Sequence, residues 1–134
     1  MPITRLGKGA LANLALGKTN ITAYCSTGAC LVVGNGNGAH SATSTFLSGA
    51  SKAIAALSGA PTISAFTALS TNVDLTFNAT FQSSEANFAW EEWGIYNATS
   101  SSADGYLLNR YVGTIGTKTC AQSWAMTATI TLTT

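Results

Sequence analysis

Two segments with strictly alternating apolar residues constrain this fold more than any other feature of the sequence. Segment 72–82 reads NVDLTFNATFQ and segment 122–133 reads QSWAMTATITLT, with an apolar side chain at every second position in each. Successive side chains of a β-strand point to opposite faces of the sheet, so a period of two predicts one buried and one solvated face. Both segments are therefore predicted to be half-buried strands.

A third strand is predicted between them, with an irregularity inside it. Segment 88–97 reads FAWEEWGIYN, and its apolar alternation slips by one residue at Glu91–Glu92. Such a slip is what a β-bulge produces, because one strand contributes an extra residue there. Segment 106–115, YLLNRYVGTI, is predicted to return as its antiparallel partner.

The first half of the chain carries weaker signals. Residues 29–33 form a short apolar run that ends at the glycine-rich turn GNGNG, and residues 51–57 are compatible with two helical turns. Apolar residues spaced by about four over residues 5–16 indicate a short helix, although two glycines weaken that signal. Residues 1–18 are thus predicted to form a short helix or an arm that docks on a partner.

Together these segments predict an all-β fold. Several strands separated by turns rich in Gly, Ser and Asn are typical of an antiparallel β-sandwich, here expected to be jelly-roll-like. A length of 134 residues favours one such domain over residues 1–134. The residues predicted to hold its core are Phe77, Trp90, Trp93, Gly94, Leu108, Trp124 and Ile130.

The charge content narrows the classes of partner. Charged residues make up 8% of the chain and hydrophobic residues 46%, with six Lys or Arg against five Asp or Glu. This balance argues against a nucleic-acid or membrane surface, and no apolar stretch is long enough for a membrane-spanning helix. So few charges are typical of a subunit within an assembly, but also of a Thr/Ser-rich β domain that needs little charge. Both interpretations stay open at this stage.

Candidate groups for chemistry are sparse, and we expect no catalytic residue, metal or cofactor. His40 is the single histidine, and no CxxC pair accompanies it, which argues against zinc. Glu91 and Glu92 should point to opposite faces of a strand, and neither Glu85 nor Asp104 is placed to converge with them as a glycosidase requires.

Other side chains have structural interpretations. A glutamate buried near the bulge is expected to pair with Arg110 across the hairpin. Trp90 and Trp93 are expected to fill the core, the alternative being an aromatic platform for carbohydrate. The odd number of cysteines favours free thiols, with a disulfide between Cys25 and Cys30 as the alternative.

Residues 81–134 resemble a group of small structural proteins of tailed bacteriophages. The shared pattern opens at Glu85–Phe88 and continues through the aromatic core Trp90–Asn97 and the Leu-Asn-Arg block at 108–110. It closes with Gly-Thr-Lys at 116–118 and the alternating segment 124–132. The upstream segment 31–52 fits the pattern more loosely, so the resemblance covers about two-thirds of the chain.

This resemblance implies a non-enzymatic virion component made in the cytoplasm of the host bacterium. The compact chain looks most like a capsid cement or decoration protein, which would bind the major capsid protein on the outer surface of the shell, at contacts between capsomers. A tail, tail-fibre or collar module, with receptor or glycan binding, is the alternative, since related patterns occur there. Self-association as a dimer or trimer is expected for so uncharged a chain. Position and apolar character suggest Ile3, Arg5 and Leu6 as partner contacts on a docking arm. Deletion of residues 1–8 is expected to leave the domain folded but to weaken its binding to virions.

Overall fold

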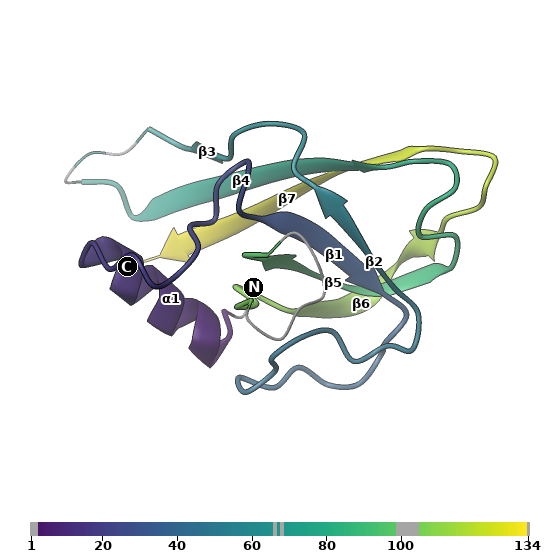
Figure 1. The fold of residues 1–134 in the computed structure, drawn as a ribbon, viewed down its shortest axis with the longest axis horizontal. Coiled ribbons are helices and arrows are strands. Elements are labelled where there is room, and N and C mark those ends of the chain that lie inside the picture. The colour runs from purple at the N-terminus through teal and green to yellow at the C-terminus, as the bar shows by residue number, and fades with distance from the viewer. Residues whose placement is uncertain (1–2, 66, 68, 99–104, 134) are drawn as a thin grey trace.

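The fold is a two-layer β-sandwich with one helix at its N-terminal end (Figure 1). The computed structural model describes residues 3–65, 67, 69–98 and 105–133. Within them, one sheet has the strand order β2-β1-β5-β6 and the other the order β3-β4-β7, all pairings being antiparallel. The elements are α1 (Arg5–Ala15), β1 (Cys30–Gly34), β2 (Lys52–Ala56), β3 (Thr62–Ile63), β4 (Asn72–Phe81), β5 (Ala89–Tyr96), β6 (Tyr111–Thr117) and β7 (Trp124–Thr133).

The two alternating segments form neighbouring strands, as predicted. β4 and β7 pair over ten residues each, with Phe77 opposite Ala128 near the middle. Their apolar faces point toward the other sheet, while the odd-numbered residues of β7 from 125 to 133 are exposed. Burial of one face per strand accounts for the period of two in both segments.

The four-stranded sheet is buried on both sides at β1. Leu31 and Val33 point into the space between the sheets, and Val32 packs on the outer side with Leu47 from the long segment that links β1 to β2. All five residues of β1 are buried. A strand covered on both faces reads as a continuous apolar run, which is why this strand shows no alternation in the sequence.

The predicted core is confirmed. Phe77, Trp90, Trp93, Leu108 and Ile130 are all buried in one cluster between the sheets, and Trp124 is half-buried against it. The Trp90 ring lies edge-on to the rings of Phe81 and Trp124, with centroids 4.9 and 5.0 Å away.

Gly94, the last predicted core position, is buried where β5 closely approaches the segment that precedes β6. A Cβ atom at Gly94 would lie 2.5 Å from the carbonyl oxygen of Asn109, so a larger residue would push the two segments apart.

Two details differ from the sequence predictions. Residues 52–56 form strand β2 rather than helical turns, because pairing with β1 lets the small residues Ala53 and Ala55 face the core. The strand expected over 106–115 begins as isolated bridges and becomes continuous only at Tyr111. The described residues contain seven strands arranged four against three, which confirms the predicted β-sandwich, while its jelly-roll-like character stays a prediction.

The N-terminal segment contains the predicted helix, and its first turn is built into the domain rather than extended as an arm. The Thr4 side chain caps α1 by accepting a hydrogen bond from the Gly7 amide at 2.9 Å, and it donates one to the Leu107 carbonyl. Ile3 is half-buried against the core and bridges to Asn109. The expectation that residues 1–8 are dispensable for folding is therefore not supported.

We expect Thr4→Ala to lower the free energy of unfolding by about 1–2 kcal/mol. The substitution removes the helix cap and leaves the Leu107 carbonyl without its donor in a buried setting. Thr4→Ser is the matched control, since it retains the hydroxyl and should cost less than half as much. Urea unfolding followed by circular dichroism measures both. Equal losses for the two variants would show that the methyl group, and not the cap, stabilises this end.

Candidate functional site

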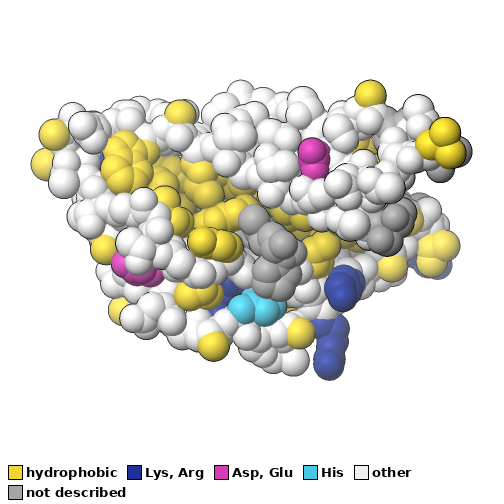
Figure 2. All heavy atoms as spheres, turned by 180° about the vertical axis from the view of Figure 1, so that it is seen from behind, with side chains coloured by type: hydrophobic (Ala, Val, Ile, Leu, Met, Phe, Trp, Pro, Cys, Tyr) yellow, Lys and Arg dark blue, Asp and Glu magenta, His cyan; other side chains and the backbone are white. Residues whose placement is uncertain are grey.

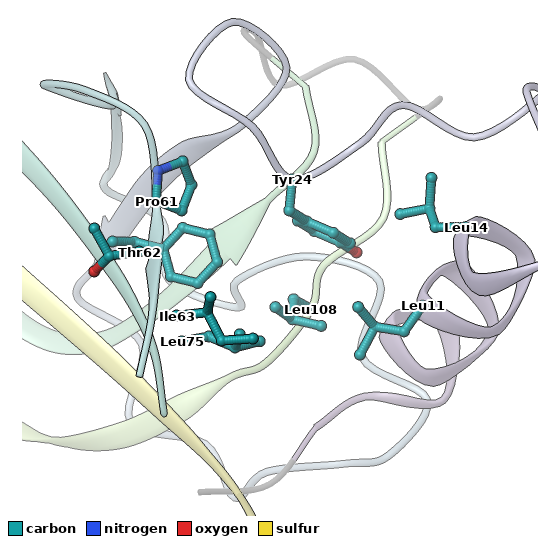
Figure 3. Close-up of a pocket in the computed structure, with 9 residues that line it drawn as sticks. Leu11, Leu14, Tyr24, Pro61, Thr62, Ile63, Leu75 and Leu108 are labelled. Carbon is teal, nitrogen blue, oxygen red and sulfur yellow. The ribbon is translucent and has the colours of Figure 1, made fainter. Parts of the chain in front are cut away.

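An apolar groove lies between the helix and the short strand β3 (Figure 3). Its volume is about 230 Å³, and its lining consists of Leu11, Leu14, Tyr24, Pro61, Thr62, Ile63, Leu75, Phe77 and Leu108. Hydrophobic side chains also gather in a hollow on the face opposite to that of Figure 1, as a feature separate from this lining (Figure 2). None of the nine lining residues carries a charge, so the groove suits an apolar ligand or side chain.

Each wall of the groove comes from a different element. Leu11 and Leu14 are one helical turn apart on α1, so both face the same side. On the opposite wall Ile63 of β3 is 56% exposed. The sequence indicated the apolar spacing in the helix but gave no signal for Ile63, because a strand of two residues is too short to show a period.

Tyr24 is the main polar side chain of the groove. Its hydroxyl donates a hydrogen bond to the carbonyl oxygen of Tyr106 at 3.0 Å. Burial, with a smaller effect from Tyr106 itself, raises the pKa of Tyr24 well above its usual value. The phenol therefore stays neutral, and the groove keeps its uncharged character at any physiological pH.

A buried ion pair forms the second notable site. Arg110 Nε donates to Glu92 Oε2 at 2.7 Å, with the two side chains 3% and 0% exposed. A register shift between Trp90 and Glu92 marks the irregularity in the pairing of β5 with β6. The predicted bulge and the predicted pairing of Arg110 with a buried glutamate are both confirmed.

The ion pair fastens the long segment between β1 and β2 to the sheet. Glu92 accepts hydrogen bonds from the amides of Gly49 and Ser48 at 2.6 and 3.1 Å. Arg110 donates to the carbonyls of Gly38 and Ala39 at 3.0 and 3.1 Å and to the Ser48 hydroxyl at 2.7 Å. Both charged groups are thus occupied by partners within the chain, which fits a structural role rather than acid–base chemistry.

Glycine is required beside this pair. A Cβ atom at Gly34 would lie 2.7 Å from Glu92 Oε1, so the carboxylate occupies the space that a side chain there would need. The first glycine of GNGNG therefore makes room for a buried charge, in addition to ending a strand.

The other candidate groups are dispersed. Glu91 accepts a hydrogen bond from the Thr114 hydroxyl, and Glu85 accepts one from the Gln82 amide. His40 is half-buried, and Asp104 lies outside the described residues. Among the residues that the structure describes, no three His, Cys, Asp or Glu side chains are grouped as metal ligands.

The three cysteines are free thiols, as the sequence favoured. Cys30 is buried and donates to the Ala98 carbonyl at 2.8 Å, and burial raises the pKa of its thiol to about 12. Cys120 is exposed. Oxidation or alkylation would therefore affect Cys120 before Cys30.

The two tryptophans of the predicted carbohydrate platform are internal. Trp90 is 2% exposed and Trp93 is 8% exposed, so neither presents a ring face on which a sugar could stack. The Trp90 indole N–H donates to the Ala86 carbonyl at 2.9 Å. This result supports the core-filling interpretation of both residues.

The three predicted partner contacts lie at the start of α1. Arg5 is exposed, and its amide donates to the Ala42 carbonyl at 2.8 Å, while Ile3 and Leu6 are half-buried. They do not line the groove. In the described part of the chain, no helix has the length and apolar character needed to cross a membrane.

Comparisons with models of protein families, with curated proteins and with solved structures found no match for this chain.

Proposed function

We propose that this protein is a structural subunit of a tailed-bacteriophage virion, and specifically a capsid cement protein. It would bind the major capsid protein on the outside of the head, at contacts between capsomers, and stabilise the shell. Many symmetry-related copies would multiply a modest affinity per site.

The observation that carries this proposal is the open apolar groove on a chain with so few charges. Ile63, 56% exposed, and the leucines of α1 offer an uncharged surface on which an apolar side chain of a partner would be buried. We infer that a segment of the capsid protein with an apolar side chain fills this groove. No charged side chain lies among the lining residues to select a charged ligand instead.

The segments that resemble phage structural proteins support the same assignment. The block Trp90–Asn97 supplies Glu92, and the block Leu108–Arg110 supplies its partner, so two of the shared motifs meet in one buried ion pair. The pair links these two segments within the frame of the sandwich. A tail or collar module is the alternative proposal, without a glycan platform on Trp90 and Trp93.

Location in the virion tests the assignment directly. Quantitative mass spectrometry on separated heads and tails should find the protein at hundreds of copies in the head fraction. A few copies confined to the tail fraction would replace the cement proposal with the tail alternative. Absence from both fractions would overturn the virion assignment altogether.

A single charge introduced into the groove tests whether the groove is the capsid contact. We expect Ile63→Asp to weaken binding to heads that lack the protein by at least tenfold, because the carboxylate would lose its hydration in an apolar contact. Leu69→Asp is the control, since Leu69 is 91% exposed and does not line the groove. Co-sedimentation with heads measures both variants. If the two bind alike, the capsid contact lies elsewhere on the surface.

A further inference from the structure

Strand β7 leaves one of its two edges unpaired. In the order β3-β4-β7 it is the last strand, and in the described part of the chain nothing pairs with its outer edge. β7 is ten residues long and contains neither proline nor any charged residue. Long, regular and uncharged edges are the ones that pair with another chain, and natural monomers usually protect them.

The other three edges are protected. β3 is two residues long, and β2 has five residues that begin with Lys52. β6 is irregular, because three of its residues lie opposite the single residue Glu91 where the register shifts. Short, charged or bulged edges discourage pairing. Of these four edge strands, β7 is therefore the one whose edge is unprotected against pairing with another chain.

The hydrogen bonds of β4 show which backbone groups of β7 are free. The carbonyls of Asp74 and Asn78 accept hydrogen bonds from Ser64 and Ser58, on the side of β4 away from β7. The odd-numbered residues of β4 must then face β7, and they pair with its even-numbered residues. The N–H and C=O groups of residues 125, 127, 129, 131 and 133 therefore point to the open edge.

We propose that β7 pairs antiparallel with β7 of a second copy of this chain, with Thr129 of each copy on the two-fold axis. This register brings all five outward-pointing residues of each strand into hydrogen-bonded pairs. It joins the two three-stranded sheets into one sheet of six strands. The inference goes beyond the proposed function and holds whether or not the protein belongs to a virion.

Side chains on both faces of the pair are complementary in this register. On the outer face Thr129 meets its own copy and Thr127 meets Thr131, which are favourable cross-strand partners. On the inner face Met126 would lie opposite Leu132, and both are only half-buried within one chain. No like charges oppose each other, since residues 124–133 carry none.

Sedimentation equilibrium under reducing conditions tests the pairing, with reductant present because Cys120 is exposed. The full chain should sediment at twice its mass of 13.7 kDa. Thr129→Lys places two like charges on the two-fold axis and should weaken the dimer at least tenfold. Thr62→Lys, at the opposite edge of the same sheet, is the matched control and should leave it unchanged. A wild type that is monomeric at 0.1 mM would overturn the proposal, because even a weak specific dimer has a dissociation constant of about that concentration.

A charge-reversal mixture separates pairing at the edge from general effects on folding. Thr129→Lys and Thr129→Glu should each be monomeric and folded, while their equimolar mixture should recover the dimer. Amide hydrogen exchange gives the register: in the wild-type dimer the Thr127, Thr129 and Thr131 amides should be protected, and in Thr129→Lys they should exchange rapidly. A wild-type dimer whose odd-numbered β7 amides exchange freely would place the interface elsewhere.

Discussion

Phe77→Asp should leave the protein unfolded at room temperature. Phe77 is 2% exposed and lies in the core between the two sheets. Truncating a buried phenylalanine costs about 3–5 kcal/mol, and a buried carboxylate without a partner adds several more. The sum is comparable to the whole stability of a typical domain, which is about 5–15 kcal/mol. Far-ultraviolet circular dichroism and the dispersion of amide resonances measure the loss.

Asn78→Asp is the matched control for that substitution. Asn78 is the next residue on β4, is exposed, and accepts a hydrogen bond from the Thr127 hydroxyl through its side-chain oxygen. A carboxylate can accept the same bond, so the free energy of unfolding should change by less than about 1 kcal/mol. Equal tolerance of aspartate at both positions would contradict the assignment of inner and outer faces on this strand.

Arg110→Ala is expected to produce the second largest loss of stability, about 3–5 kcal/mol. Glu92 is fully buried, and without Arg110 it would be a buried charge that retains only its amide donors. The carbonyls of Gly38 and Ala39 would lose their donor at the same time. Urea unfolding monitored by tryptophan fluorescence measures the change, because Trp93 is adjacent to Glu92 in the chain.

The double variant Glu92→Ala/Arg110→Ala distinguishes the cost of an unpaired charge from the loss of packing. Removing both charges should recover part of the stability lost in Arg110→Ala, because most of that loss is the uncompensated carboxylate. Glu91→Ala is the surface control, and it should cost less than about 1 kcal/mol. A double variant that is less stable than Arg110→Ala would show that Glu92 stabilises the fold through its bonds to the Gly49 and Ser48 amides.

The ion pair also explains how the loop above the four-stranded sheet is held. Six hydrogen bonds connect Glu92 or Arg110 to residues 38–49, three accepted by the carboxylate and three donated by the guanidinium. The loop covers the outer face of β1, where Val32 packs with Leu47. Loss of the pair should therefore expose that outer face before it disrupts the core between the sheets.

Local sequence patterns determined the strands of this fold that have one buried face and one solvent-exposed face. The period of two fixed the faces of β4 and β7, and the slip at Glu91–Glu92 located the irregularity of β5. Arg110 was predictable as the partner of a buried glutamate because it lies in the segment expected to pair with the bulged strand. The sequence has few other charged residues with which it could pair. These features are local, so neighbouring residues carry the signal.

Only the tertiary structure decided the features that depend on distant segments. It made 52–56 a strand, because pairing with β1 outweighs a weak helical pattern in small residues. It selected Glu92 rather than Glu91 as the buried acid, since the loop over residues 38–49 surrounds one face of β5 alone. The groove at Ile63 and the open edge of β7 follow from the order of strands in the sheet. Sequence periodicity does not predict that order, because it is set by packing between distant segments and not by neighbours in the chain.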